Sequence, residues 1–80
     1  MRTFRQCIDD GSTLSSSADD TFPNIDTAIL DTIKAAAMIA GEEVNQRPIQ
    51  TFTCEAQDAV THEVRRATVS FSVHFQQLDT

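Results

Sequence analysis

Cysteine and histidine are the residues of this sequence whose side chains are best suited to nucleophilic chemistry. A cysteine becomes an effective nucleophile when a base lies within hydrogen-bond reach, about 3 Å, and holds it as the thiolate. Alternation along the predicted strands places Cys7 and His74 on the outward face of a sheet and Cys54 on its inward face. Cys7 is expected closer to Ser70 or Phe71 than to any base. We therefore predict an accessible thiol without a catalytic role, and no disulfide within the chain; a reactive or intermolecularly bridged Cys7 is the alternative.

Four aspartates flank a serine-rich segment and form a second group that bears on chemistry. Calcium needs six to eight oxygen ligands at a fixed loop spacing, and the spacing here does not match a calcium-binding loop. Residues 12–21 are predicted to be an acidic, solvated loop, although a short hairpin arm around Leu14 is a second interpretation. No metal or cofactor is expected. A weak cation site and a contact with a basic groove of another protein remain open alternatives. The four residues are Asp9, Asp10, Asp19 and Asp20.

The charge balance restricts the classes of partner. Twelve acidic and six basic residues among 80 give a formal net charge of −6, and binding to phosphate backbones needs clustered Lys and Arg. Direct nucleic-acid binding is therefore not expected. The adjacent Arg65 and Arg66 are interpreted as the charged start of an edge strand. The N-terminal residues become acidic before any apolar stretch forms, and no apolar run approaches the ~20 residues of a membrane span. We expect a cytoplasmic protein with reduced thiols.

The segment from Asn24 to Val44 is the one long and regular enough for a helix of several turns. Asn24 is a favourable N-cap, because its side chain can accept a hydrogen bond from a first-turn amide. The apolar stripe continues past Gly41, so the helix is predicted to run to Val44. At about 100° per residue one face covers the core. That predicted core face comprises Ile29, Ile33, Ala36, Ala37, Ala40 and Val44.

Three segments alternate with a period of two and are predicted to be strands: Arg2–Ile8, Ile49–Ala56 and Arg65–Gln76. The last has the longest unbroken alternation. The second and third form an antiparallel hairpin, and the first is expected to lie antiparallel to the third. The 80 residues thus predict a single α+β domain of β-α-β-β layout, with a three-stranded, mainly antiparallel sheet and one long helix on one face.

Several features of this layout occur together in one family. They are an opening strand that ends in Asp-Gly, an acidic loop, a Phe-Pro-Asn helix start, an alanine-rich helix and a last strand containing Val-Ser-Phe-Ser-Val. The residues concerned are Phe4, Ile8, Asp10-Gly11, Asp19-Asp20, Phe22-Pro23-Asn24, the helix alanines and the strand ending at Phe75. The chain resembles, over nearly its whole length, a family of small bacterial proteins catalogued only as a domain of unknown function. The resemblance implies the fold and no activity.

Two predicted surfaces are suited to a protein partner. One is the outer face of the helix, where Met38 lies near the middle with small or apolar neighbours; methionine adapts readily to partner surfaces. The other is the open sheet face, which is polar and carries few charges. The candidate contact residues are Asp31, Ala35, Met38, Ile39 and Glu42 on the helix, with Ala28 along the same flank, Asp19 and Asp20 in the acidic segment, and Arg5 and His74 on the sheet.

The sequence favours a non-enzymatic protein-binding function. The narrower hypothesis is a phage or mobile-element inhibitor that blocks a bacterial defence complex by covering its surface, as an anti-CRISPR protein does. The alternative is a homodimeric interaction or regulatory module of the uncharacterised family. An enzyme that uses Cys7 is the least favoured hypothesis, because no base is predicted beside this thiol.

Overall fold

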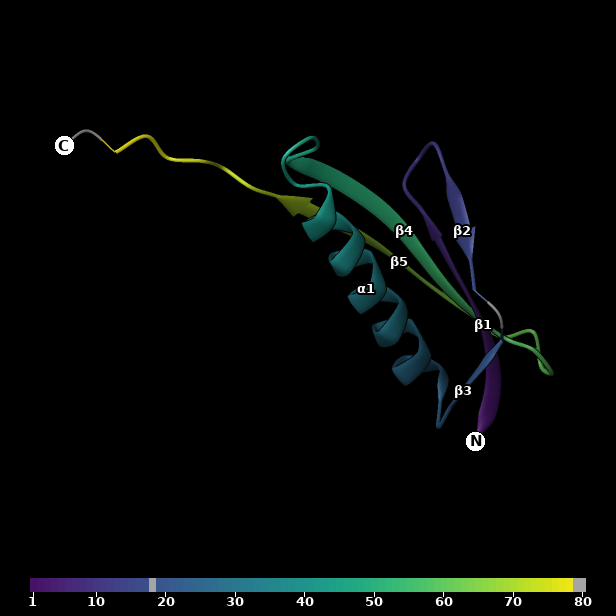
Figure 1. Cartoon of the computed structure of the whole chain (residues 1–80). Coiled ribbons are helices and arrows are strands. Elements are labelled where there is room, and N and C mark those ends of the chain that lie inside the picture. Colours follow the sequence, from purple (N-terminus) through teal and green to yellow (C-terminus); the bar gives the residue numbers. More distant parts are fainter. Residues whose placement is uncertain (18, 79–80) are drawn as a thin grey trace.

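The computed structural model describes residues 1–17 and 19–78, and within these ranges one helix packs against an antiparallel sheet of five strands (Figure 1). The sheet order is β2-β1-β4-β5, and β3 pairs with the opposite end of β1 from β2. The α+β class is therefore as predicted, while the three-stranded β-α-β-β layout lacked two short strands. The elements are β1 Arg2–Asp9, β2 Leu14–Ser16, β3 Asp20–Phe22, α1 Ile25–Glu42, β4 Ile49–Asp58 and β5 Val64–Ser72.

β4 is the central strand, which corrects the prediction that the first strand pairs with the last. β1 pairs with β4 from Phe4 opposite Asp58 to Asp9 opposite Thr53, and β5 pairs with the other edge of β4. β4 is buried at every second position over its whole length, as a strand with neighbours on both sides and a helix above it should be. Its buried residues are Gln50, Phe52, Cys54, Ala56 and Asp58.

β2 and β3 lie where an acidic loop over residues 12–21 was expected, so that prediction was wrong in part. Both segments pair with the outer edge of β1, with Ser15 opposite Ile8 and Thr21 opposite Thr3. All three side chains of β2 are exposed, so backbone hydrogen bonds rather than a buried face hold it in place. A strand without a buried face has no apolar alternation to announce it. We call β2 and β3 together the edge arm.

Helix α1 begins as predicted and ends earlier than predicted. The Asn24 side chain accepts a hydrogen bond from the Thr27 amide at 2.9 Å, which caps the first turn. The helix includes Gly41 and ends at Glu42, and the amide of Glu43 closes the last turn on the Ile39 carbonyl. Val44 lies beyond the helix and does not extend the core stripe.

The buried stripe of α1 is rotated from the predicted one. Ala28 is fully buried although it was placed on the outer flank, and Ala37 is exposed although it was placed in the core. Ile33 is half-buried. The stripe turns toward the β1 side because the helix makes polar contacts with β1 as well as packing over β4. The buried helix residues are Ile25, Ala28, Ile29, Thr32, Ala36 and Ala40.

Two glutamines join the sheet to the helix from inside. The Gln6 amide nitrogen lies 2.9 Å from Asp31 Oδ2 and 2.9 Å from Thr32 Oγ1. The buried Gln50 donates to the backbone carbonyls of Ala40 and Arg47 at 3.0 and 2.9 Å. Each glutamine faces the helix among apolar neighbours, and each has its amide N–H groups satisfied there.

β5 ends at Ser72, four residues before the predicted end at Gln76. Its partner β4 begins at Ile49, opposite Ser72, so β4 has no further strand residue to pair with. The Val73 amide still donates to the Pro48 carbonyl at 2.8 Å. Beyond it the chain leaves the sheet in an extended path (Figure 1). We call residues 73–78 the C-terminal tail. Phe75, an apolar position of the alternation that predicts this strand, is 77% exposed there.

Candidate functional site

The side of the sheet opposite α1 is the broadest candidate surface, and no helix or strand of the described residues covers it. We call this side the open face. Across β4 and β5 it presents directly opposed pairs of small polar side chains. Thr51 and Ser70 form such a pair, with their hydroxyl oxygens 3.3 Å apart, and Thr53 and Thr68 form the next. These side chains present methyl and hydroxyl groups to solvent.

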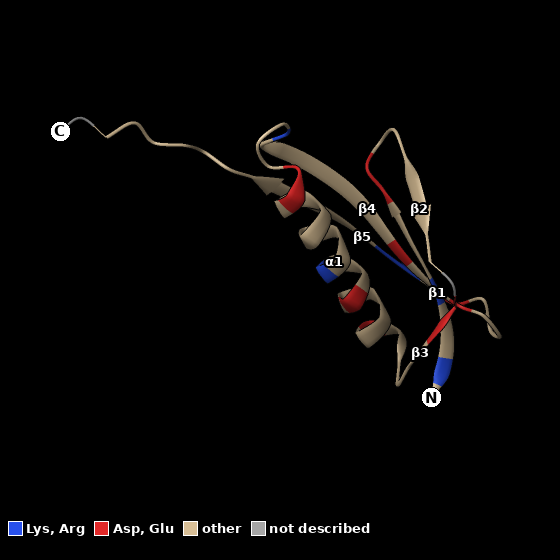
Figure 2. Cartoon of the chain, viewed as in Figure 1, with Lys and Arg blue, Asp and Glu red and all other residues tan. Residues whose placement is uncertain are grey.

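The arginines of the open face are paired with carboxylates; Figure 2 marks the acidic and basic residues along the chain. Arg66 donates two hydrogen bonds to Glu55 Oε2, at 3.0 and 2.6 Å, across β4 and β5. Arg5, one of the predicted contact residues, forms an ion pair with Asp19 at 3.5 Å. Because each of these arginines already has a carboxylate partner, a protein that covers this face does not leave their charges buried and unpaired.

The open face is hollowed between the edge arm and β5. The hollow has a volume of about 550 Å³. The exposed Leu14 side chain of β2 borders it on one side and the Arg66–Glu55 pair on the other. It is wide enough to accept a side chain from a partner. Its remaining lining residues are Cys7, Asp9, Thr53 and Thr68.

The two cysteines face opposite sides of the sheet, as predicted. Cys54 is fully buried against the helix, and burial raises the pKa of its thiol. Cys7 is half-buried on the open face, where its Sγ lies 3.8 Å from Ser16 Oγ. Both are free thiols. His74 is not on the sheet, because it belongs to the C-terminal tail; the prediction that it lies on the open face was wrong. Cys7 lies opposite Glu55, not near the last strand.

The helix surface predicted for a partner is divided between two environments. Met38 is 69% exposed and lies on the outer face as expected, and Glu42 is exposed at the last turn. Ala35 and Ile39 are half-buried, because they turn toward the edge arm and line small grooves between α1 and β2, each of about 180 Å³. Asp31 accepts a hydrogen bond from Gln6. The predicted stripe is therefore not one continuous surface.

The aspartates around residues 12–21 act mainly on their own backbone. Asp10 accepts hydrogen bonds from the amides of Ser12 and Thr13 at 2.9 and 2.7 Å, and these lower its pKa to about 2. Asp20 accepts from the Thr21 amide at 2.8 Å. Among residues 1–17 and 19–78, no group of three or more His, Cys, Asp or Glu side chains is arranged to hold a metal ion.

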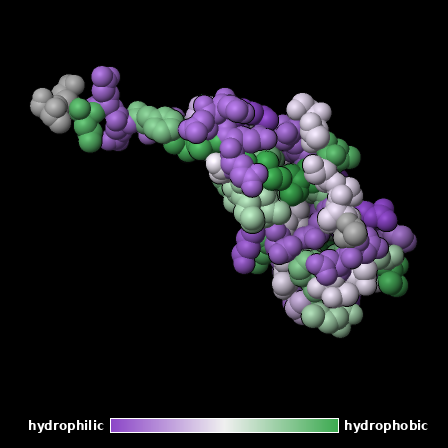
Figure 3. Space-filling view, in the orientation of Figure 1, coloured by the Kyte–Doolittle hydropathy of each residue, from purple (hydrophilic) through white to green (hydrophobic). Residues whose placement is uncertain are grey.

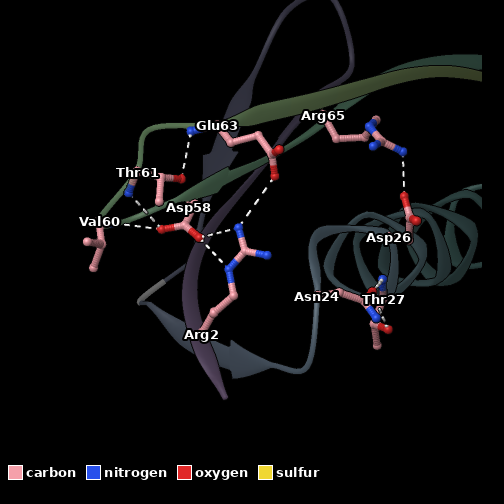
Figure 4. A network of polar contacts seen from close by, with 9 residues as sticks. All are labelled: Arg2, Asn24, Asp26, Thr27, Asp58, Val60, Thr61, Glu63 and Arg65. Carbon is pink, nitrogen blue, oxygen red and sulfur yellow. Dashed lines mark hydrogen bonds and ion pairs between the residues drawn. The ribbon is translucent and has the colours of Figure 1, made fainter.

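A buried carboxylate that sequence reasoning missed ties β1 to the turn after β4 (Figure 4). Asp58, at the end of β4, accepts hydrogen bonds from the Val60 and Thr61 amides at 2.8 and 3.0 Å. Its other oxygen accepts from Arg2, which also contacts Glu63. The two backbone amides, and then Arg2, lower the pKa of Asp58 to about 2. Because both Asp58 oxygens already accept hydrogen bonds, we assign this residue a structural role. The sequence feature that could have indicated it is the polar Gln57-Asp58 pair directly before a turn.

No helix in the described part of the chain has the length and apolarity to cross a membrane. Comparisons with protein-family models, with curated proteins and with solved structures find no match for this chain. The family resemblance suggested by the sequence therefore stays a prediction.

Proposed function

We propose that this chain is a non-enzymatic protein-binding module that acts by covering part of a partner's surface with its open face. The observation that carries the proposal is the Thr51–Ser70 and Thr53–Thr68 array beside the paired Arg66 and Glu55. Such a surface combines apolar methyl groups with hydroxyls able to bond to a partner. Its two arginines are already paired with carboxylates, which lowers the desolvation cost of covering it.

The hollow between the edge arm and β5 adds a point of specificity. A flat surface alone recognises a partner weakly, whereas a side chain buried at the centre of an interface dominates its affinity. The exposed Leu14 gives this hollow an apolar wall, and Arg66 gives it a cationic one. A partner side chain with an apolar stem and a hydrogen-bonding end fits both walls.

The narrower form of the proposal is an inhibitor from a phage or mobile element that covers a surface of a bacterial defence complex. It rests on the small size and acidic charge of the chain, which favour soluble binding to basic protein surfaces. Purified defence effector complexes are tested for co-purification with the tagged chain, and phage plating is measured in cells that express it. If neither assay gives a signal, the narrower form is wrong while the general one stands.

The general form is tested with a pair of charge-matched variants. Thr68→Arg places a long cation in the middle of the open face, whereas Gln46→Arg adds the same charge at an exposed turn after α1. With any partner identified by cross-linking, Thr68→Arg should weaken binding about tenfold or more, an effect of ~1.4 kcal/mol. Gln46→Arg should leave affinity within about twofold. Equal affinities for both variants would remove the open face from the interface.

A further inference from the structure

The outer edge of β5 is the long unprotected edge of the sheet. Among the described residues, no strand pairs with this edge, whereas the edge arm covers the outer edge of β1. The edge extends over the nine residues of β5, and the C-terminal tail continues it in line (Figure 1). Unpaired strand edges expose N–H and C=O groups that readily pair with another strand.

The tail carries apolar side chains that the described chain leaves in solvent. Val73 is 40% exposed, Phe75 77% and Leu78 80%. Figure 3 shows hydrophobic groups alternating with hydrophilic ones along this tail. An extended segment that keeps strand alternation through Gln76, with no strand beside it among the described residues, is suited to pairing with a second chain.

Backbone hydrogen bonds fix which residues of β5 point outward. The Glu63 carbonyl and the Val73 amide both bond toward the β4 side, to Asp58 and Pro48, at 2.8 Å each. Hydrogen-bonding direction alternates along an antiparallel strand, so odd-numbered residues bond to β4 and even-numbered residues offer their groups to the free edge. If two copies pair edge to edge about a two-fold axis, even residues must face even residues. The two-fold axis must then lie where one residue faces the same residue of the other copy, not midway between two neighbouring residues.

The residue types around Phe71 are the same on both sides. Ser70 and Ser72 flank it directly, and Val69 and Val73 lie one position further out. An axis through Phe71 places Val69 opposite Val73 and Ala67 opposite Phe75 of the second copy, all on the helix side. On the other side it pairs polar groups, with Ser70 opposite Ser72 and Thr68 opposite His74. At its ends Val64, which is 44% exposed, faces Leu78.

We propose that two copies of this chain pair through β5 and the C-terminal tail, antiparallel, with Phe71 on the two-fold axis. Each exposed apolar residue of the tail then gains an apolar neighbour from the other copy. Pairing of residues 64–78 from both copies joins the two sheets into one continuous sheet. The interface is isologous, as closed two-fold dimers require.

Other registers fit less well. An axis at Val69 or Ser70 places Arg65 opposite an apolar residue, and an axis at Ser72 places Leu78 opposite Arg66. In the Phe71 register both arginines face glutamines, Arg65 opposite Gln77 and Arg66 opposite Gln76. No like charges are opposed, and the pairs of Arg65 with Asp26 and of Arg66 with Glu55 are retained.

The helix flank beside β5 also suits a second copy. Arg65 contacts Asp26 in the first turn of α1 (Figure 4), so the flank of the helix that carries Asp26 borders β5. Leu30 lies one turn further along the same flank and is 57% exposed. Phe75 of a second copy, opposite Ala67 on this side of the sheet, comes to lie near Leu30 and removes further apolar surface from water.

The existence of the dimer is tested by sedimentation of the full chain. At a protein concentration of roughly 100 µM, a dimer with a micromolar dissociation constant would predominate. The wild type should have about twice the 8.8 kDa mass of the monomer. Phe75→Lys should be monomeric, since it places a charge opposite Ala67. Met38→Lys, a matched change at an exposed residue of the outer helix face, should remain dimeric. A monomeric wild type, or a dimer lost in Met38→Lys and kept in Phe75→Lys, would overturn the proposal.

The register is tested with two variants in which Cys7 is replaced by serine, so that the introduced cysteine is the exposed thiol while Cys54 stays fully buried. Thr68→Cys and His74→Cys are mixed under oxidising conditions; facing residues of a bonded pair lie about 5.5 Å apart between Cα atoms, within disulfide range. A disulfide-linked dimer should form in the mixture. Neither variant should cross-link alone, since each cysteine lies about 20 Å from its own copy. Cross-linking of Thr68→Cys alone, or none in the mixture, contradicts this register. Because both changes lie outside the core, folding is not at stake, and failure here leaves the proposed open-face function untouched.

Discussion

The two edges of the sheet differ in how they meet solvent. β1 is covered by the edge arm, whose strands are three residues each and exposed apart from the half-buried Phe22. β5 is open for its full length among the described residues and continues into an apolar tail. Proteins commonly protect edges with short, polar or charged strands. One edge is therefore closed within the chain, while the other retains both the hydrogen-bonding groups and the apolar side chains that a second strand needs.

The largest expected difference between the two edges concerns their phenylalanines. Phe4 of β1 is fully buried, whereas Phe75 beyond β5 is 77% exposed. Phe4→Ala should lower the free energy of unfolding by about 3–5 kcal/mol, because it leaves a cavity. Phe75→Ala should change the stability of the dilute monomer by less than about 0.5 kcal/mol. Urea denaturation at low protein concentration measures both. Similar losses for the two variants would mean that the tail packs on its own chain.

The contact of Asp58 with Arg2 of β1 should make the free energy of unfolding depend on pH in the acid range. Asp58 has a pKa of about 2 in the folded chain, below its ordinary value near 3.8. The folded state therefore binds fewer protons between these values, and stability is lost as pH falls from about 4 through 2. Asp58→Asn should lower the urea midpoint at pH 7 and flatten the decline at low pH. Glu42→Gln, at an exposed position on α1, is the control and should retain the wild-type decline.

Hydrogen exchange compares the two edges directly. The outward amides of Thr68 and Ser70 on β5 should exchange at least about tenfold more slowly at high protein concentration than at high dilution, since a second copy protects them. The Ile8 amide of β1, in the row that faces Ser15 of the edge arm, should show the same protection at both concentrations. Exchange rates at Thr68 and Ser70 that do not change with protein concentration would contradict pairing of two copies through β5.

The smallest expected effects come from the two glycines. Gly11, in the turn before the edge arm, has φ of +96°, so Gly11→Ala should cost about 1 kcal/mol and speed exchange at Ile8. Gly41 lies within α1 with open space around its Cβ direction. Gly41→Ala should stabilise the chain by about 0.5–1 kcal/mol without altering exchange at either edge. Thermal unfolding should show a lower midpoint for Gly11→Ala and a higher one for Gly41→Ala. An unchanged midpoint for Gly11→Ala would show that its turn does not hold the edge arm in place.

Local patterns predicted the long elements and the direction of most side chains. Asn24 caps the helix because its amide oxygen reaches the first-turn amides, and this depends only on neighbouring residues. The opposite facing of Cys7 and Cys54 follows from strand alternation alone. The edge arm was predicted as a loop, with a hairpin arm around Leu14 as the alternative, because its strands are only three residues long and Phe22 alone among their side chains is partly buried. The candidate contact residues Ala35 and Ile39 are half-buried, because the arm approaches that side of the helix.

By itself the sequence determined the helix start, the three long strands and their faces, because hydrogen bonding within a turn and the alternation of side chains are local properties. Only the tertiary structure decided that β4 is central, that the edge arm closes β1, and that the alternation continues over residues 73–76 past the end of the sheet. Alternation states which face a residue takes but not which strand lies beside it. That choice is made by long-range packing, and it is what leaves β5 and its tail without a neighbour within the described chain.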